Sequence, residues 1–405
     1  MAEETIITSR SDILSLLSEA CELEHGLACS YLYTAFTLKH DLGEGGMTWQ
    51  QQQLVRKWAA QIFFVAAQEM LHLAQVWNLL ASIGGTPYYL RPNFPQGSKY
   101  YSFGLPLTLE PFGRPALQRF RYYERPLGVS PERTFFKELG VSAGEVISPE
   151  YRTVGELYEL ILSAITAIPE NRLFIGNEKR QVGGELADFP DIVKVVDLKS
   201  AHEAIVRITH QGEGTVVDRT DCHFGMFTNV LRELEAEQAA SGDGFAPARN
   251  TIENPVAHYR ADYGALKGNV IENEYTREVA ELFDDVYVLM LRILSYVFSN
   301  STGDVELLRK FSRIAITMMP TVILPLGEAL TLLPAGKSYG DKTAGPAFGL
   351  SRHVSLPPDP QAASIVVGER VAELISRSGA LTEQAQSPRQ LSIAKRNLEA
   401  LARIQ

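Results

Sequence analysis

Residues 66–87 read AAQEMLHLAQVWNLLASIGGTP, and this stretch decides the fold. Its apolar residues recur at the spacing of a buried helix face, and the pattern extends back to about residue 48. Residues 84–87, GGTP, then stop the pattern, because glycine and proline end helices. We therefore predict a long amphipathic helix from about Thr48 to Ile83.

Two polar residues lie inside the apolar stripe of this predicted helix. Glu69 follows Ala66 by three positions, and His72 follows Glu69 by three, so all of them point the same way. A Glu-x-x-His pair on its own is a common accident of sequence. It becomes informative only if a second helix brings another carboxylate to the same place.

The preceding helix, predicted over residues 9–40, carries such a carboxylate. Glu24 follows Ala20 by four positions and precedes Leu27 by three, which places it in the apolar stripe. A buried carboxylate is costly unless it finds a cation, a proton or a hydrogen-bond donor. A Glu-x-x-His pair facing a glutamate on a neighbouring helix is the arrangement of di-iron and di-manganese sites in helical bundles. Carboxylate oxygen and imidazole nitrogen suit iron, with manganese as the alternative metal.

Three later segments offer further candidate ligands. Glu156 shares a helix face with apolar residues, but it also completes a capping box that begins at Thr153, so both roles remain open. His210 and Glu213 stand three apart in ITHQGEGT, residues 208–215, where the glycines allow a close approach of the backbone. His223 lies on the apolar side of its own predicted helix; a lone histidine there is more often a satisfied core residue, but with Glu213 it would form a second Glu/His pair.

The rest of the chain reads as mainly α-helical. We expect a helical core over residues 9–240, interrupted by a long excursion rich in Pro, Tyr and Phe at 88–150, and a helical extension at 241–405 packed on it. Short and long helices are predicted at 115–123, 153–168, 200–214, 221–240, 275–298 and 305–333. The tail from Pro334 reads as loop-rich, with a last helix at 390–404.

Composition limits the function. A formal net charge of −10 and the lack of a basic run argue against nucleic-acid binding. Three sparse cysteines and an N-terminus without an apolar leader favour a cytoplasmic protein. The most apolar stretch, Ile314 to Leu333, contains two prolines and Glu328, so we predict a buried, kinked helix and no membrane span.

Several strings resemble one family, and they keep its order from residue 12 to about 350. They are ELEHGLACSYLYTAF (22–36), AAQEMLHLAQVWNLLASIGGTP (66–87), TVGELYELI (153–161), ITHQGEGT (208–215), HFGMF (223–227), LGEALTLLPAG (326–336) and TAGPAF (343–348). They are similar to the ferritin-like family named for iminophenyl-pyruvate dimer synthases, which includes the large enzymes of violacein and indolocarbazole assembly. The first two strings are specific in combination, and the others are supportive.

The resemblance implies a ferritin-like four-helix bundle with additional C-terminal helices. It also implies a metal-ligand set, which transfers to Glu24, Glu69, His72, Glu156, Glu213 and His223. His210 stands where the family's EQGEG string has a glutamate. The residue at this position is therefore either a different metal ligand or a residue that contacts the ligands without binding the metal.

These observations lead to a hypothesis of function. We expect a non-haem di-iron oxidase or oxygenase in which two irons, a small aromatic metabolite and dioxygen meet inside the bundle. Glu69 and Glu213 would bridge the irons. The remaining ligands would be the terminal carboxylates Glu24 and Glu156 and the nitrogens of His72 and His223. Tyr31, two turns beyond Glu24, would hydrogen-bond a ligand or relay a radical, although core packing is the simpler explanation. The excursion at 88–123 would roof the pocket.

Three alternatives stay open. The same pocket would serve the oxidative coupling of two aryl imines, as the family name suggests. Iron storage and a metal-free scaffold belong to different classes of function. The sequence leaves a homodimer, the substrate and the choice between one and two metals undecided.

Overall fold

The structure is a computed structural model of the whole chain. It describes residues 9–96, 105–129, 135–139, 151–187, 189–214, 220–258, 268–300 and 303–404. Within these ranges the regular structure is almost entirely helical, and the strands are two short parallel segments, β1 (Pro255–Val256) and β2 (Asn269–Val270). The predicted mainly α class is confirmed.

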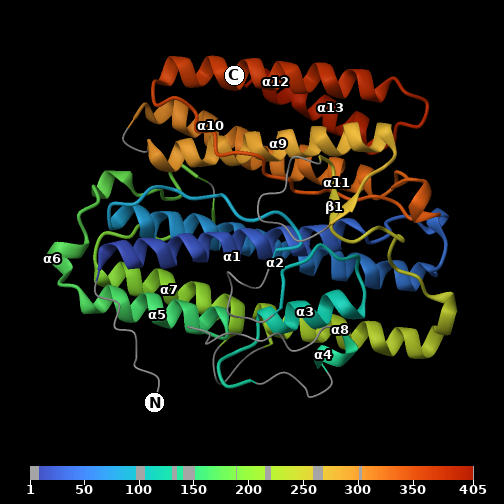
Figure 1. Cartoon of the computed structure of the whole chain (residues 1–405), viewed down its shortest axis with the longest axis horizontal. Coiled ribbons are helices and arrows are strands. Elements are labelled where there is room, and N and C mark those ends of the chain that lie inside the picture. Colours follow the sequence, from blue (N-terminus) through green and yellow to red (C-terminus); the bar gives the residue numbers. More distant parts are fainter. Residues whose placement is uncertain are drawn as a thin grey trace.

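The helices form three layers (Figure 1). The middle layer is the pair α1 (Arg10–Phe36) and α2 (Trp49–Ser82), which pack along each other. On one side lie α3 (Arg114–Tyr123), α5 (Val154–Ala167), α7 (Leu198–Glu213) and α8 (His223–Ser241). On the other side lie α9 (Glu274–Ser299), α10 (Val305–Met318), α11 (Leu324–Leu330), α12 (Pro360–Thr382) and α13 (Arg389–Ala402). The single-turn helices α4 (Phe135–Glu138) and α6 (Glu170–Leu173) lie in connections.

Local signals explain how the central pair begins. The Ser9 side chain accepts a hydrogen bond from the Asp12 backbone, and Thr48 and Gln51 form a capping box at the start of α2. From residue 20 of α1 and residue 69 of α2 onward, almost every side chain is buried, because both helices are covered by other helices on two sides. Residues that lie off the apolar stripe in the sequence can therefore still be buried.

One prediction about the tail is wrong. The segment that was expected to be a loop contains α12, whose buried residues are Ala363, Val367, Val371, Leu374, Ser378 and Leu381. These positions repeat at helical spacing, so the signal is present, but serine and glycine interrupt its apolar character. The helix packs on α9 and α13 and completes the outer layer.

The apolar stretch at the start of the outer layer is a bent core helix. Residues Met319–Ile323 form a π-helical segment between α10 and α11, and Pro320 and Pro325 lie in and just after it. The Asn397 amide of α13 donates to the Thr321 carbonyl at 2.6 Å. Val305–Leu330 is long and apolar enough to span a membrane, but more than half of its most apolar window is buried inside the fold, as in a core helix.

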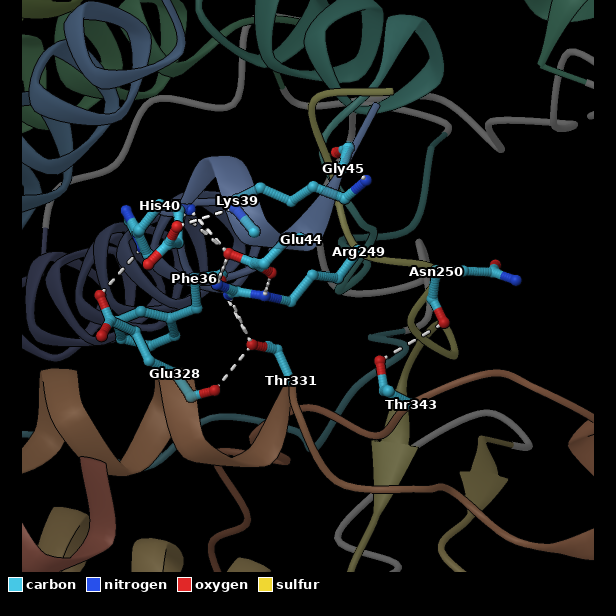
Figure 2. Close-up of polar contacts among 12 residues, drawn as sticks. Phe36, Lys39, His40, Glu44, Gly45, Arg249, Asn250, Glu328, Thr331 and Thr343 are labelled. Carbon is cyan, nitrogen blue, oxygen red and sulfur yellow. Dashed lines mark hydrogen bonds and ion pairs between the residues drawn. The ribbon is translucent and has the colours of Figure 1, made fainter. Parts of the chain in front are cut away.

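Arg249 joins the middle layer to the outer layer (Figure 2). Its guanidinium donates to the Phe36 carbonyl at the end of α1 and to the Thr331 hydroxyl at the end of α11, both at 3.0 Å. It also pairs with both oxygens of Glu44 in the short helix Leu42–Glu44, at 2.7 and 3.0 Å. The buried guanidinium therefore satisfies its charge while it fixes three segments. The boundary predicted near residue 240 stays a prediction.

Candidate metal centre

Five buried side chains meet between the middle layer and the layer of α3, α5, α7 and α8. Glu24 comes from α1, Glu69 and His72 come from α2, Glu124 directly follows α3, and His223 begins α8. None of them is more than 3% exposed. Three carboxylates and two imidazoles thus share an interior from which water is excluded, and such a set needs protons or cations to be stable.

The first half of the cluster is made of Glu24, Glu69 and His72, whose potential ligand atoms all lie within 4.8 Å of one another. The imidazole Nδ1 of His72 lies 2.9 Å from Glu69 Oε2 and 3.4 Å from Glu24 Oε2. The outer nitrogen, His72 Nε2, faces the amide oxygen of Gln211 at 2.8 Å. A proton on Nε2 would leave the Nδ1 lone pair directed at the two carboxylates.

The second half repeats this pattern with Glu69, Glu124 and His223. His223 Nδ1 lies 2.8 Å from Glu69 Oε1 and 3.5 Å from Glu124 Oε2. His223 Nε2 faces the amide oxygen of Gln68 at 3.1 Å. Glu69 therefore belongs to both halves, with one oxygen toward each histidine.

Burial and proximity shift the pKa values of this cluster in opposite directions. Burial, and then the neighbouring Glu69 carboxylate, raises the pKa of Glu24 to about 7. Burial alone would lower the pKa of His223, but the Glu69 and Glu124 carboxylates raise it to about 9. Burial would also lower the pKa of His72, but the carboxylates outweigh it and raise this pKa. Burial would raise the pKa of Glu69, but the two histidines outweigh it and lower this pKa. Without a metal, the cluster therefore offsets the excess negative charge of its carboxylates by retaining protons.

Two atoms of the cluster show that its hydrogen bonding is incomplete. Glu69 Oε1 and His223 Nδ1 are buried without a hydrogen bond, and ion-pair contacts, 2.8 Å to each other and 3.5 Å from Nδ1 to Glu124 Oε2, are what they make instead. A cation between a carboxylate oxygen and an imidazole nitrogen would satisfy both atoms. This donor set fits iron or manganese, and the three cysteines, whose thiolates would favour zinc, do not belong to either half.

The comparison with known families agrees with this geometry. The ferritin-like family matches residues 17–232, which is more than half of the chain. The chain belongs to the ferritin-like family. Its match contains every residue of the five-member cluster, all of α2 and most of α1.

Relatives of this ferritin-like protein are named as biosynthetic enzymes. It is 29% identical to a dichlorochromopyrrolate synthase of Lentzea aerocolonigenes, over 91% of this chain and 39% of that protein. It is 26% identical to a 2-imino-3-(indol-3-yl)propanoate dimerase of Chromobacterium violaceum, over 84% of this chain and 34% of that protein. The resemblance that the sequence strings indicate is confirmed, and the chain spans less than two fifths of the length of these curated relatives. A solved ferritin-like protein from Caulobacter vibrioides is 17% identical with a TM-score of 0.46, over 74% of this chain and 90% of that one.

The ferritin-like core brings together four of the predicted ligands, Glu24, Glu69, His72 and His223. The fifth member of the cluster, Glu124, is absent from our sequence prediction. It follows Phe120 by four positions on a helix whose buried residues include Phe120, so the criterion that selected Glu24 also selects it. The sequence signal is weak because Glu124 lies just beyond the end of a short helix.

Three other predicted ligands, Glu156, His210 and Glu213, lie outside the two ligand groups. The Glu156 carboxylate accepts a hydrogen bond from the Arg152 backbone, and its own backbone donates to Thr153, as in a helix cap. His210 is exposed on α7. Neither residue belongs to the two groups of clustered ligand atoms, so a ligand role for them stays a prediction.

Glu213 lies close to the cluster but outside both groups. Its oxygens accept hydrogen bonds from the Gly155 backbone at 2.8 Å and the Leu127 backbone at 3.2 Å. Burial raises its pKa to about 7. A Cβ on the adjacent Gly212 would lie 3.2 Å from Glu124 Oε2, so the glycine lets the end of α7 pack against the cluster. The predicted bridging role of Glu213 stays a prediction.

Proposed function

We propose that this protein is a di-metal oxidase, with iron as the metal, that acts on a small aromatic metabolite. The position of Glu69 carries the proposal, because its two oxygens face two different histidines in two overlapping ligand groups. A carboxylate shared between two such groups is the arrangement by which a helical bundle holds two metal ions side by side. The relatives support an enzymatic role, since both are named for reactions.

The chain's own residues would prepare the site. A metal pair, when bound, supplies electron-transfer chemistry that amino-acid side chains lack. His72 and His223 would present neutral Nδ1 atoms, because Gln211 and Gln68 accept a hydrogen bond from each outer nitrogen. Glu24 would release its proton on metal binding, since a ligating carboxylate must be ionised. Burial would keep bulk water from the reacting groups.

Oxidative coupling of aryl imines is the specific reaction that the relatives favour. One relative is named as a dimerase of an indolyl imino acid, and the other as the synthase of a dichlorochromopyrrolate. In such a coupling a new bond joins two imino acids as two hydrogens are removed, and dioxygen would take up the two electrons and two protons. We propose this as the finer form of the oxidase function.

Metal quantitation with iron spectroscopy tests the first part. Wild-type protein from iron-supplemented cultures is expected to hold one iron in each of the two groups. Glu69→Ala should lose both, because Glu69 belongs to both groups. The control is Gln75→Ala, which removes a buried side chain of the same helix that hydrogen-bonds the Val193 backbone instead. Equal iron in wild type and Glu69→Ala would contradict the proposal.

A coupling assay tests the second part. The iron-loaded protein is incubated in air with the imine that an amino-acid oxidase forms from tryptophan, and dimers are sought by mass spectrometry. Dimer that depends on the wild-type protein and disappears with Glu69→Ala is the expected result. A fully loaded protein that consumes no imine would remove the coupling reaction and leave the metal site in place.

A further inference from the structure

The Glu24 carboxylate is held at both of its oxygens. Oε2 faces the His72 imidazole at 3.4 Å, on the side of the shared Glu69. Oε1 accepts a hydrogen bond from the hydroxyl of Tyr158, which projects from α5 and is fully buried. The carboxylate therefore has an inner oxygen directed at the ligand group and an outer oxygen occupied by a phenol.

Glu124 has the same arrangement in the other half. Its Oε2 lies 3.5 Å from His223 Nδ1, and its Oε1 accepts a hydrogen bond from the hydroxyl of Tyr31. Tyr31 is fully buried on α1 and its ring packs on Phe120 and Phe227. The two tyrosines come from different helices, so the repetition does not follow from one local sequence pattern.

The two phenols would be permanent donors. Each phenol O–H is fully buried and donates to a carboxylate oxygen. A hydrogen bond from a hydroxyl to a buried carboxylate is among the stronger ones in proteins. Breaking it to turn the outer oxygen toward a cation would leave a buried hydroxyl without an acceptor.

On the basis of the proposed function, we infer that Tyr158 and Tyr31 are positioning residues that restrict Glu24 and Glu124 to one ligating oxygen each. A carboxylate can bind a cation through one oxygen or both. Here the phenols withhold the outer oxygens, so each cation would keep a position for an exogenous ligand such as dioxygen or substrate. The alternative role for these tyrosines is core packing, in which the hydroxyl merely finds an acceptor.

Binding of Co²⁺ to the metal-free protein separates the two roles. Its visible absorption weakens as the number of ligands rises, so it reports coordination directly. Tyr158→Phe should bind as many ions as wild type, with weaker absorption from one ion and a binding step weakened by about tenfold. Tyr31→Phe should affect the other ion in the same way. Tyr33→Phe is the matched control, because Tyr33 is equally buried on α1 but donates to the Ile252 carbonyl.

Each outcome is decisive. Spectra and binding constants of both variants that match Tyr33→Phe would overturn the positioning role and leave the metal site intact. A wild-type protein that takes up no Co²⁺ would instead contradict the proposed function. Thermal unfolding of each metal-free variant checks folding; if one of the two unfolds, the other still tests the inference, since each tyrosine serves its own half of the cluster.

Discussion

Two buried polar clusters lie on opposite sides of α1, and each contains one of two adjacent residues of this helix. Glu24 faces the candidate metal centre, whereas His25 faces α9 in the outer layer. The His25 ring is held between the Tyr89 carbonyl, 2.8 Å from Nδ1, and the Tyr287 hydroxyl. Both clusters are inaccessible to water, but they differ in the balance of their charged groups.

The cluster around His25 is matched in that a cation lies among its hydrogen-bond acceptors. Arg91 supplies its cation and donates to the Phe348 carbonyl at 2.7 Å and the Pro92 carbonyl at 3.1 Å, and the Cys29 sulfur lies 3.1 Å from Tyr287 Oη. The cluster around Glu24 instead combines three carboxylates with two histidines. The difference teaches that buried polarity alone does not indicate a metal. An excess of carboxylates with imidazole nitrogens directed at them does.

The largest predicted effect comes from breaking the matched cluster. Arg91→Met leaves buried carbonyls without donors, and we expect the free energy of unfolding to fall by about 3 kcal/mol. Urea unfolding of the metal-free protein measures it. The iron content per folded chain should equal that of wild type, because Arg91 is not part of either ligand group. A loss of iron in the folded fraction would show that the two clusters are coupled.

For Glu24→Gln in the metal-free protein we expect a smaller effect of opposite sign, namely a higher stability than that of wild type above pH 7. The pKa of Glu24 is about 7 in the fold and near 4.5 in an unfolded chain, so the fold binds the proton more tightly. Its stabilising contribution is complete below pH 4.5 and is lost as the pH rises to 7. The wild-type melting temperature should therefore fall across this interval.

Glutamine at position 24 cannot ionise, so the variant should show a flatter pH profile and be more stable than wild type above pH 7, while it binds less iron. His223 contributes in the same direction at higher pH, because its pKa is raised from 6.5 to about 9. Melting curves of both proteins in the presence of a chelator test this prediction. A wild-type profile that rises between pH 4.5 and 7 would contradict it.

The smallest effect is expected for a carboxylate that satisfies backbone donors instead of a cation. Glu156→Ala removes the acceptor of the Arg152 backbone and should lower the free energy of unfolding by about 1 kcal/mol, the usual cost of one lost hydrogen bond. Iron content should not change. Glu156→Gln, which keeps an acceptor, is the control. Loss of iron in both variants would restore Glu156 as a ligand.

Sequence periodicity was sufficient to identify a residue of the cluster wherever a polar residue interrupts a long apolar stripe. Glu24, Glu69 and His72 lie on helices of 27 and 34 residues, in which the spacing fixes the buried face. Glu124 could have been found in the same way, but it closes a helix of ten residues, whose period is harder to recognise. His25 shows the limit: its position off the stripe suggests exposure, yet a second layer of helices buries it completely.

The sequence by itself therefore determined the helices of the bundle, the family and four of the clustered side chains. Tertiary structure alone decided that Glu69 is shared between two histidines, that Glu124 takes a place in the cluster, and that Tyr158 and Tyr31 hold the outer oxygens. It also placed the Glu156 carboxylate on the Arg152 backbone. The physical reason is that helical spacing fixes the direction of a side chain around its own axis. Which distant groups meet there depends on how separate helices pack.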